Sequence, residues 1–276
     1  AHNGREAAAA VAELARGAAE GPHRAYLAAG AEVIRTRTGS LGRWRCNMEG
    51  IPEHFAKANT RACAAAIGAR DAVDPGALVA GTLGPVRPRY EPDLLPPPPV
   101  IERETVEQAL VLAPHVDLFL CETLTLGAEA AAMARAALST GRPVWVSFTF
   151  HERGPLATRG GETPAQALDA LEGLPVDAIL VNCTSAEVVG EAVAAFAALA
   201  PETAVGGYAH GFETVGGREA DVTVSDAVDG RIAMTPAGYA RFAREWIAAG
   251  ATIVGGCCDV GPSHIAALRK LVEEDQ

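Results

Sequence analysis

The sequence predicts an α/β fold, a (β/α)8 TIM barrel whose first strand is absent from the 276 residues. Short apolar runs alternate with alanine-rich helical stretches along most of the chain, which is typical of a parallel sheet. The runs are apolar almost throughout, as expected for strands covered on both faces. The length is close to that of one barrel, so we expect a single domain over residues 1–276. A doubly wound sheet is the alternative architecture.

Seven apolar runs have the character of strands, with β-branched or aromatic residues and flanking Gly, Pro or Asp. They cover residues 31–38, 78–83, 116–123, 143–150, 178–184, 204–210 and 251–258. Helical spacing of Ala, Ile and Leu predicts helices over residues 53–73, 104–112, 129–139, 163–171, 186–199 and 235–249. Thr163 and Thr235, each followed by proline, are start signals, and Gly141 and Gly250 are stop signals.

The beginning of the chain does not supply an eighth strand. Residues 5–29 have a helical pattern with no strand before them, and seven strands would leave two open sheet edges. We therefore expect about 20 further N-terminal residues that contain the first strand. The alternative is that residues 1–16 form the eighth strand, although their run of alanines has poor β-propensity.

Two irregular segments interrupt the alternation of strands and helices. Residues 84–99 are rich in proline, which predicts a surface loop or a lid. Residues 211–234 are polar and dotted with glycine, and residues 221–231 within them are a candidate short hairpin.

Composition narrows the class of partner. Lys and Arg number 23 against 34 Asp and Glu, a net charge of -11, which argues against nucleic acid and against anionic membranes. No apolar stretch reaches the roughly 18 residues of a membrane-spanning helix. Residues 1–20 lack the basic start and apolar run of a signal peptide, so we expect a cytoplasmic protein. Small-molecule substrates are the expected partners, and the sequence leaves the oligomeric state open.

Three of the six cysteines fall at predicted strand ends, where barrels of this kind place their active sites. These are Cys183, Cys257 and Cys258, whereas Cys46, Cys63 and Cys121 lie elsewhere. Neighbouring residues of a strand point to opposite faces, so the adjacent pair can share a metal only if the backbone leaves the strand. Gly255 and Gly256 are expected to provide that freedom.

Three converging thiolates suit zinc and leave a fourth position open, as in catalytic zinc sites. The alternatives are a phosphate-binding loop at Gly255-Gly256 and a packing role for Cys257-Cys258. Polar residues at the other strand ends are Thr36, Thr38, Glu122, Thr149, His151, Asn182, Tyr208 and His210.

Several of these segments resemble the homocysteine S-methyltransferases. The segments VNCTS, which contains Asn182 and Cys183, and GGCCDVGPSHI at residues 255–265 are similar to the zinc motifs of that family. Further similar segments are YLAAGAEVI at 26–34, GTLGP at 81–85, Glu122-Thr123 with Glu129, and Ser147-Phe148-Thr149. The resemblance covers about residues 20–276 and implies a (β/α)8 barrel with zinc on Cys183, Cys257 and Cys258.

The resemblance also implies an activity. It is the transfer of a methyl group from a cationic donor to the thiol of homocysteine, giving methionine. We expect S-methylmethionine rather than betaine as the donor, because the sequence is short and has no evident tail for oligomerisation. Glu122 would hold the ammonium group of the substrate, and a buried ion pair is its alternative role. Thr36, Thr38 and Thr149 are the other predicted substrate contacts.

The sequence departs from the family pattern in three places. No segment matches the Asp-Gly-Gly loop that follows the first strand. Residues 36–39 read Thr-Arg-Thr-Gly where Thr-Asn-Thr-Phe is usual, and residues 208–210 read Tyr-Ala-His where Tyr-Pro-Asn is usual. These departures keep an alternative open, a zinc-binding barrel with an altered thiol substrate or without catalytic activity.

Overall fold

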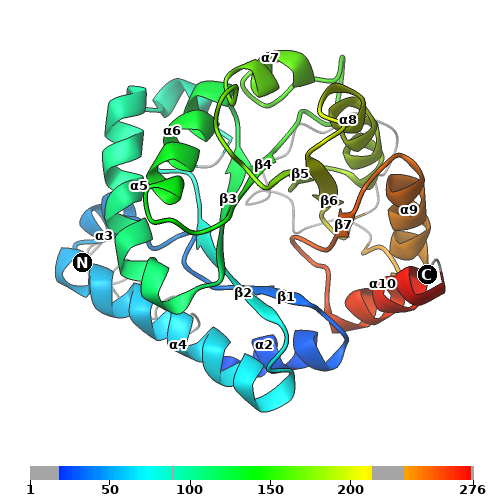
Figure 1. Cartoon of the computed structure of the whole chain (residues 1–276), viewed down its shortest axis with the longest axis horizontal. Helices are drawn as coiled ribbons and strands as arrows, with labels where there is room; N and C mark the ends of the chain where they lie inside the picture. Colours follow the sequence, from blue (N-terminus) through cyan, green and yellow to red (C-terminus); the bar gives the residue numbers. More distant parts are fainter. Residues whose placement is uncertain (1–18, 89, 213–232, 275–276) are drawn as a thin grey trace.

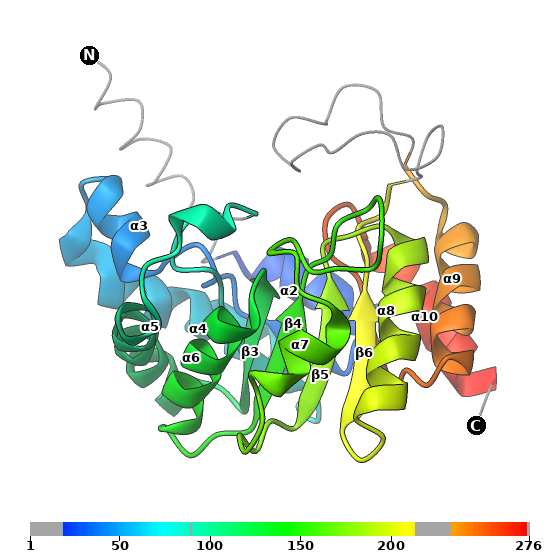
Figure 2. The ribbon, with the colours of Figure 1, turned by 90° about the horizontal axis from the view of Figure 1, so that it is seen from above.

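In the computed structural model, seven parallel strands of the described residues curl into a half-barrel, with helices outside the sheet (Figure 1 and Figure 2). The structure describes residues 19–88, 90–212 and 233–274. The strands follow chain order and are β1 (Val33–Arg35), β2 (Leu78–Leu83), β3 (Leu118–Leu124), β4 (Val144–Phe148), β5 (Ala178–Asn182), β6 (Ala204–Tyr208) and β7 (Ile253–Val254). Each strand overlaps one predicted run, so the predicted α/β fold of the TIM-barrel type is confirmed.

The helices form the outer layer. They are α2 (Glu20–Ala28), α3 (Arg43–Met48), α4 (Phe55–Val73), α5 (Pro98–Leu112), α6 (Gly127–Leu138), α7 (Pro164–Asp169), α8 (Ala186–Leu199), α9 (Pro236–Ala248) and α10 (Pro262–Glu274). Short 3-10 turns cover Pro52–His54, Pro92–Leu94 and Ala113–His115. All six predicted helices are present, whereas α3 and α10 were not expected.

The predicted end of one loop was wrong. The predicted loop over residues 84–99 is too long at its end, because α5 already begins at Pro98. Proline is well tolerated in the first helical turn, since the N–H that it lacks would have no partner inside the helix.

The predicted helix signals are confirmed. Thr163 forms a capping box with Gln166, in which each side chain bonds to the backbone of the other residue. Thr235 caps α9 in the same N-terminal position. Gly141 and Gly250 have φ angles of 76° and 109°, a left-handed conformation that suits glycine at a helix end.

Alternation along the strands creates two apolar layers. Residues of β3 illustrate it, because Phe119 and Cys121 pack in the layer beneath the helices while Leu118 and Leu120 face the inside of the curled sheet. The inner cluster consists of Ala80, Leu118, Leu120, Ala178, Leu180 and Tyr208. The next inward position of β3 is Glu122, so polar residues begin where the inner apolar cluster ends.

The sheet has two open edges within the described residues. Among these residues, β1 pairs only with β2, and β7 pairs only with β6. The gap between β1 and β7 is covered on the outside by α2 and α10, which lie side by side (Figure 1). The Tyr26 hydroxyl donates to the Val260 carbonyl at 2.8 Å, and Arg269 pairs with Glu32 at 2.7 Å. The expected further N-terminal residues stay a prediction. Residues 1–18 and the candidate hairpin at 221–231 lie outside the described part of the chain.

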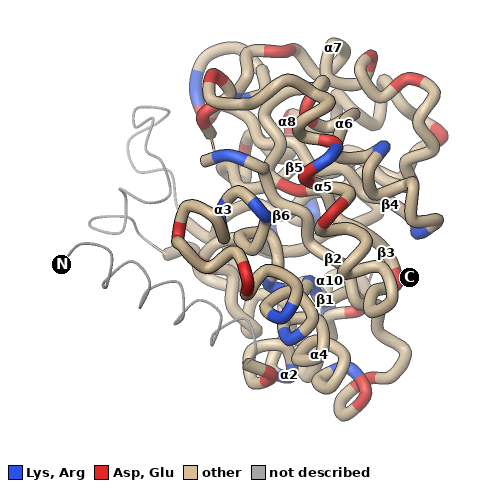
Figure 3. The backbone as a smooth tube through the Cα atoms, turned by 90° about the vertical axis from the view of Figure 1, so that its left-hand side faces the viewer, with Lys and Arg blue, Asp and Glu red and all other residues tan. Residues whose placement is uncertain are grey.

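Charged residues of both signs are interspersed along the backbone on the side that Figure 3 shows. None of the helices in the described ranges combines the length and the apolar character needed to cross a bilayer.

Candidate functional site

The three cysteines predicted as metal ligands come together at the carboxyl ends of β5 and β7. The Sγ atom of Cys183 lies 2.7 Å from that of Cys257 and 3.8 Å from that of Cys258. The Sγ atoms of Cys257 and Cys258 are 3.9 Å apart. Within the described ranges, this trio is the one group of Cys, His, Asp and Glu ligand atoms close enough to hold a metal ion.

The trio fits a tetrahedral ion. Zinc with Zn–S bonds of about 2.3 Å separates its sulfur ligands by about 3.8 Å. The separations of 3.8 and 3.9 Å match this value, and the 2.7 Å pair would open by about 1 Å. As thiols, the cysteines hydrogen-bond to one another, and the hydrogen bond to Cys183 together with burial raises the pKa of Cys257.

The backbone leaves the strand before the cysteine pair, as predicted, but for a different reason. β7 ends at Val254, and neither Gly255 nor Gly256 has a positive φ. The left-handed residue of the turn is Asp259, with φ 58°. What Gly256 provides is space, because a Cβ atom there would lie 2.0 Å from Val260 Cγ1. A Cβ atom on Gly255 would meet only Tyr208 Cβ, at an ordinary 3.5 Å.

We expect Gly256→Ala to weaken zinc binding by roughly tenfold or more, since the turn that carries both cysteines must shift. Gly255→Ala is the matched control and should bind zinc as the unaltered chain does. Competition with a chromophoric chelator measures both affinities. Equal affinities in the two variants would contradict this account of the turn.

Asn182 connects the ends of three strands. Its side chain is fully buried, and its Oδ1 accepts from the Thr123 amide at 3.0 Å and from the Ser147 hydroxyl at 2.7 Å. Its Nδ2 donates to Thr123 Oγ1 at 2.9 Å and lies 4.0 Å from Cys257 Sγ. Thr123 has a φ of 65°, which is uncommon for a β-branched residue. Asn182 thus fixes the strand ends beside the cysteines.

Glu122 lies on the inner face and forms an ion pair with Arg35 of β1. Its Oε2 also accepts from the Tyr208 hydroxyl at 3.3 Å. Burial, followed by the charge of Glu122, raises the pKa of Tyr208 well above its usual range. Glu122 therefore has the buried ion pair that was its alternative role, and no hydrogen bond to its Oε1 comes from the described residues. Its role toward the substrate stays a prediction.

Arg35 is the functional candidate that sequence reasoning missed. Its signal was available in the alternation of β1, where Ile34 packs beneath the helices and Val33 packs against the inner cluster. Arg35 therefore shares the inner face with Val33.

The three predicted threonine contacts are buried in the wall of the site. The hydroxyls of Thr36 and Thr38 are 2.7 Å apart, and both also bond to the backbone of Thr82. The Thr149 hydroxyl donates to the Cys183 carbonyl at 3.3 Å, so it supports the ligand-bearing turn. Substrate contact by these residues stays a prediction.

The proline-rich segment reaches the cysteines through Tyr90. Burial is the main cause that raises the pKa of Tyr90, and a negative charge on the Cys183 sulfur would raise it further. The Arg159 guanidinium carbon lies 4.4 Å from the Tyr90 ring centroid. Beside it, Glu152 contacts Arg159 at 3.8 Å and His210 Nε2 at 3.0 Å. These residues form a polar rim next to the thiols.

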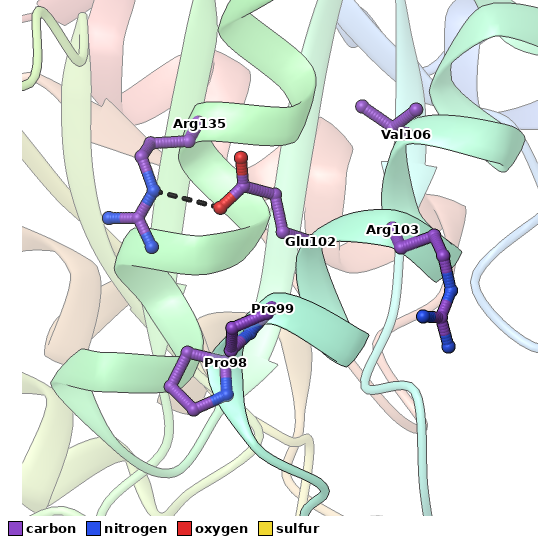
Figure 4. Close-up of a pocket in the computed structure, with 6 residues that line it drawn as sticks. All are labelled: Pro98, Pro99, Glu102, Arg103, Val106 and Arg135. Carbon is purple, nitrogen blue, oxygen red and sulfur yellow. Dashed lines mark hydrogen bonds and ion pairs between the residues drawn. The ribbon is translucent and has the colours of Figure 1, made fainter.

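A separate hollow lies on the outer helical layer between α5 and α6 (Figure 4). It contains the ion pair of Arg135 and Glu102, at 3.0 Å, and none of the residues predicted for the site. The strand ends therefore remain the candidate site.

Comparison with known structures agrees with this fold. The homocysteine methyltransferase MmuM of Escherichia coli, in its metallated form, superposes with a TM-score of 0.74 at 23% identity, covering 91% of this chain and 83% of that one. Its oxidized form gives 0.76 at 24% identity, with the same coverage. A putative α-L-fucosidase from Bacteroides thetaiotaomicron also shares the fold, with a TM-score of 0.50, 10% identity, and coverage of 78% of this chain and 72% of that one.

A family model describes the chain more directly than these structures do. The model of the homocysteine S-methyltransferase family matches residues 7–272, which includes all three clustered cysteines and Glu122. Because this match spans nearly the whole sequence, the chain belongs to the homocysteine S-methyltransferase family.

Proposed function

We propose that this chain transfers a methyl group from a cationic donor to the thiol of homocysteine with the help of zinc, and that the product is methionine. S-methylmethionine is the proposed donor, and betaine is the second candidate. The observation that carries the proposal is the trio of Cys183, Cys257 and Cys258, with Sγ separations of 2.7 to 3.9 Å, beside an inward-facing carboxylate.

The trio would hold the metal through three thiolates and leave one coordination position open. Zinc bound there supplies Lewis acidity that lowers the pKa of a substrate thiol in the open position. Asn182 keeps the ligand-bearing strand ends in register, and Thr149 supports the Cys183 carbonyl. Glu122 Oε1 would accept a hydrogen bond from the substrate ammonium, while Oε2 stays with Arg35 and Tyr208.

The proposed transfer needs no further cofactor. The homocysteine sulfur, having lost its proton to solvent, forms a bond to the methyl carbon of the donor. The bond from that carbon to the cationic sulfur or nitrogen breaks, and its electron pair leaves the donor neutral at that atom. A cationic leaving group is already activated for this displacement.

The direct test combines zinc-loaded protein, homocysteine and one donor at a time, with methionine as the product measured. We expect methionine from S-methylmethionine at a higher rate than from betaine, and none when the donor is omitted. If the protein holds one zinc ion and forms no methionine with either donor, the proposal is wrong, and the alternative of an altered thiol substrate or an inactive barrel takes its place.

We expect Glu122→Gln to raise the KM for homocysteine by roughly 10- to 100-fold, because a charge-assisted hydrogen bond to the ammonium is lost. Zinc content should not change. The matched control is Glu129→Gln, since Glu129 is also buried but accepts hydrogen bonds from the amide and the hydroxyl of Thr125, and burial raises its pKa to about 7. Loss of zinc in Glu122→Gln would instead make Glu122 a metal ligand or a support of the metal site.

A further inference from the structure

Arg35 presents a partly exposed guanidinium group on the inner face of the sheet. Its side chain is 38% exposed, whereas that of its partner Glu122 is only 8% exposed. The guanidinium carbon lies 5.8 Å from the centroid of the Tyr208 ring. The pair therefore has a sheltered acidic half and an accessible basic half.

Most of the hydrogen-bonding capacity of this pair is unused within the described residues. An arginine carries five N–H donors in a planar fork that matches a carboxylate in a bidentate manner. In the described part of the chain, only Nη1 of Arg35 is engaged, and none of its nitrogen atoms is buried without a partner. On Glu122, both contacts fall on Oε2, which leaves Oε1 for a cationic group. The pair thus offers one acceptor for an ammonium and several donors for a carboxylate.

The same pair lies beside the thiols. Tyr208, beneath the Arg35 guanidinium, is the register partner of Asn182, and Asn182 Nδ2 lies 4.0 Å from Cys257 Sγ. The charge of Glu122 is the main cause that raises the pKa of Arg35. In a γ-thiol amino acid, two methylene groups separate the sulfur from the carbon that bears the ammonium and the carboxylate. Such a molecule carries a thiol for the cysteine trio, and an ammonium and a carboxylate for the pair.

We propose that Arg35 is a specificity-determining residue that binds the α-carboxylate of the thiol substrate, while Glu122 Oε1 receives its ammonium. This inference rests on the proposed methyl transfer for the choice of a thiol as ligand. The contact between Arg35 and the carboxylate makes the site selective for zwitterionic thiols over thiols that lack a carboxylate. The competing role for Arg35 is that it only neutralises the buried charge of Glu122.

The test compares two thiols that differ by the carboxylate alone, homocysteine and 3-aminopropane-1-thiol. Their binding to zinc-loaded protein is measured by calorimetry with no methyl donor present, so a failure of methyl transfer does not affect the result. We expect the unaltered protein to bind homocysteine roughly 10- to 100-fold more tightly, the range expected for a charge-assisted bidentate contact. In Arg35→Met this ratio should fall to near 1, with zinc content unchanged.

Two further variants keep the result interpretable. Arg35→Lys retains the charge without the planar fork, and it should recover only part of the ratio. Arg37→Met removes an exposed arginine two residues further on and should leave the ratio as it is. The assignment would be overturned if Arg35→Met kept the affinity ratio of the unaltered protein, which means that it weakened the binding of both thiols equally or not at all. A ratio kept in full by Arg35→Lys would also overturn it. So would the absence of thiol binding by the unaltered zinc-loaded protein.

Discussion

Replacement of Cys257 by serine is expected to lower the zinc affinity of this chain by roughly 100- to 1,000-fold. Zinc sites with four protein ligands gain about 10–16 kcal/mol on binding, so one thiolate contributes roughly 2.5–4 kcal/mol. A serine hydroxyl is a poor substitute because it keeps its proton near neutral pH. Metal content after dialysis against a chelator of known affinity measures the loss. The equivalent changes at Cys183 and Cys258 should behave alike.

Two other cysteines serve as controls for this prediction. Cys46 of α3 and Cys63 of α4 are buried and lie outside the cluster. Their serine variants should hold one zinc ion per chain. Full retention of zinc by Cys257→Ser and Cys258→Ser would remove the metal assignment altogether.

Asn182→Ala is expected to reduce both stability and metal affinity. It leaves the Thr123 amide and the Ser147 hydroxyl without their acceptor in a buried site, at a cost of about 1–3 kcal/mol for each stranded group. Groups that orient metal ligands typically contribute about 10- to 100-fold to metal affinity, so zinc binding should weaken within that range. Urea denaturation gives the first quantity and chelator competition gives the second.

Asn59→Ala separates the two effects. Asn59 of α4 is as fully buried as Asn182. Its amide nitrogen donates to the carbonyls of Leu41 and Phe55, and its amide oxygen accepts from Gln108 of α5. Its loss should lower stability and leave zinc affinity as it was. If both variants lose zinc to the same degree, the effect of Asn182 is general destabilisation and not support of the metal site.

The parts of the fold that sequence predicts are those that depend on neighbours along the chain. An apolar run such as residues 78–83 becomes β2 with the same bounds, because a strand covered on both faces must be apolar throughout. Thr163 and Thr235 mark the starts of helices because a cap involves only the first turn. The clustering of Cys183 with Cys257 was predictable because parallel strand ends meet at one edge.

What sequence did not predict depends on distant partners. A buried ion pair was the alternative role of Glu122, but its partner Arg35 lies 87 positions away, and no local pattern specifies that pairing. Tyr90 reaches the cysteines from a loop with an irregular backbone, in which its own φ is 67°. The short helix α3 has no side-chain cap and only six residues, so its pattern is too brief to recognise.

The brevity of β7 has a consequence for how the edge of the sheet opens. This strand joins β6 through two register pairs, and backbone hydrogen bonds from Thr252, Gly255 and Cys257 extend the contact. Local opening of this edge costs less free energy than global unfolding. A metal ion bound by Cys183, which follows β5, and by the cysteines after β7 would hold this edge of the sheet closed. Binding to the closed form alone adds RT ln(1 + [M]/Kd) to the free energy of opening. Free metal concentration would thereby set the amide-exchange rate and the protease access of the last strand.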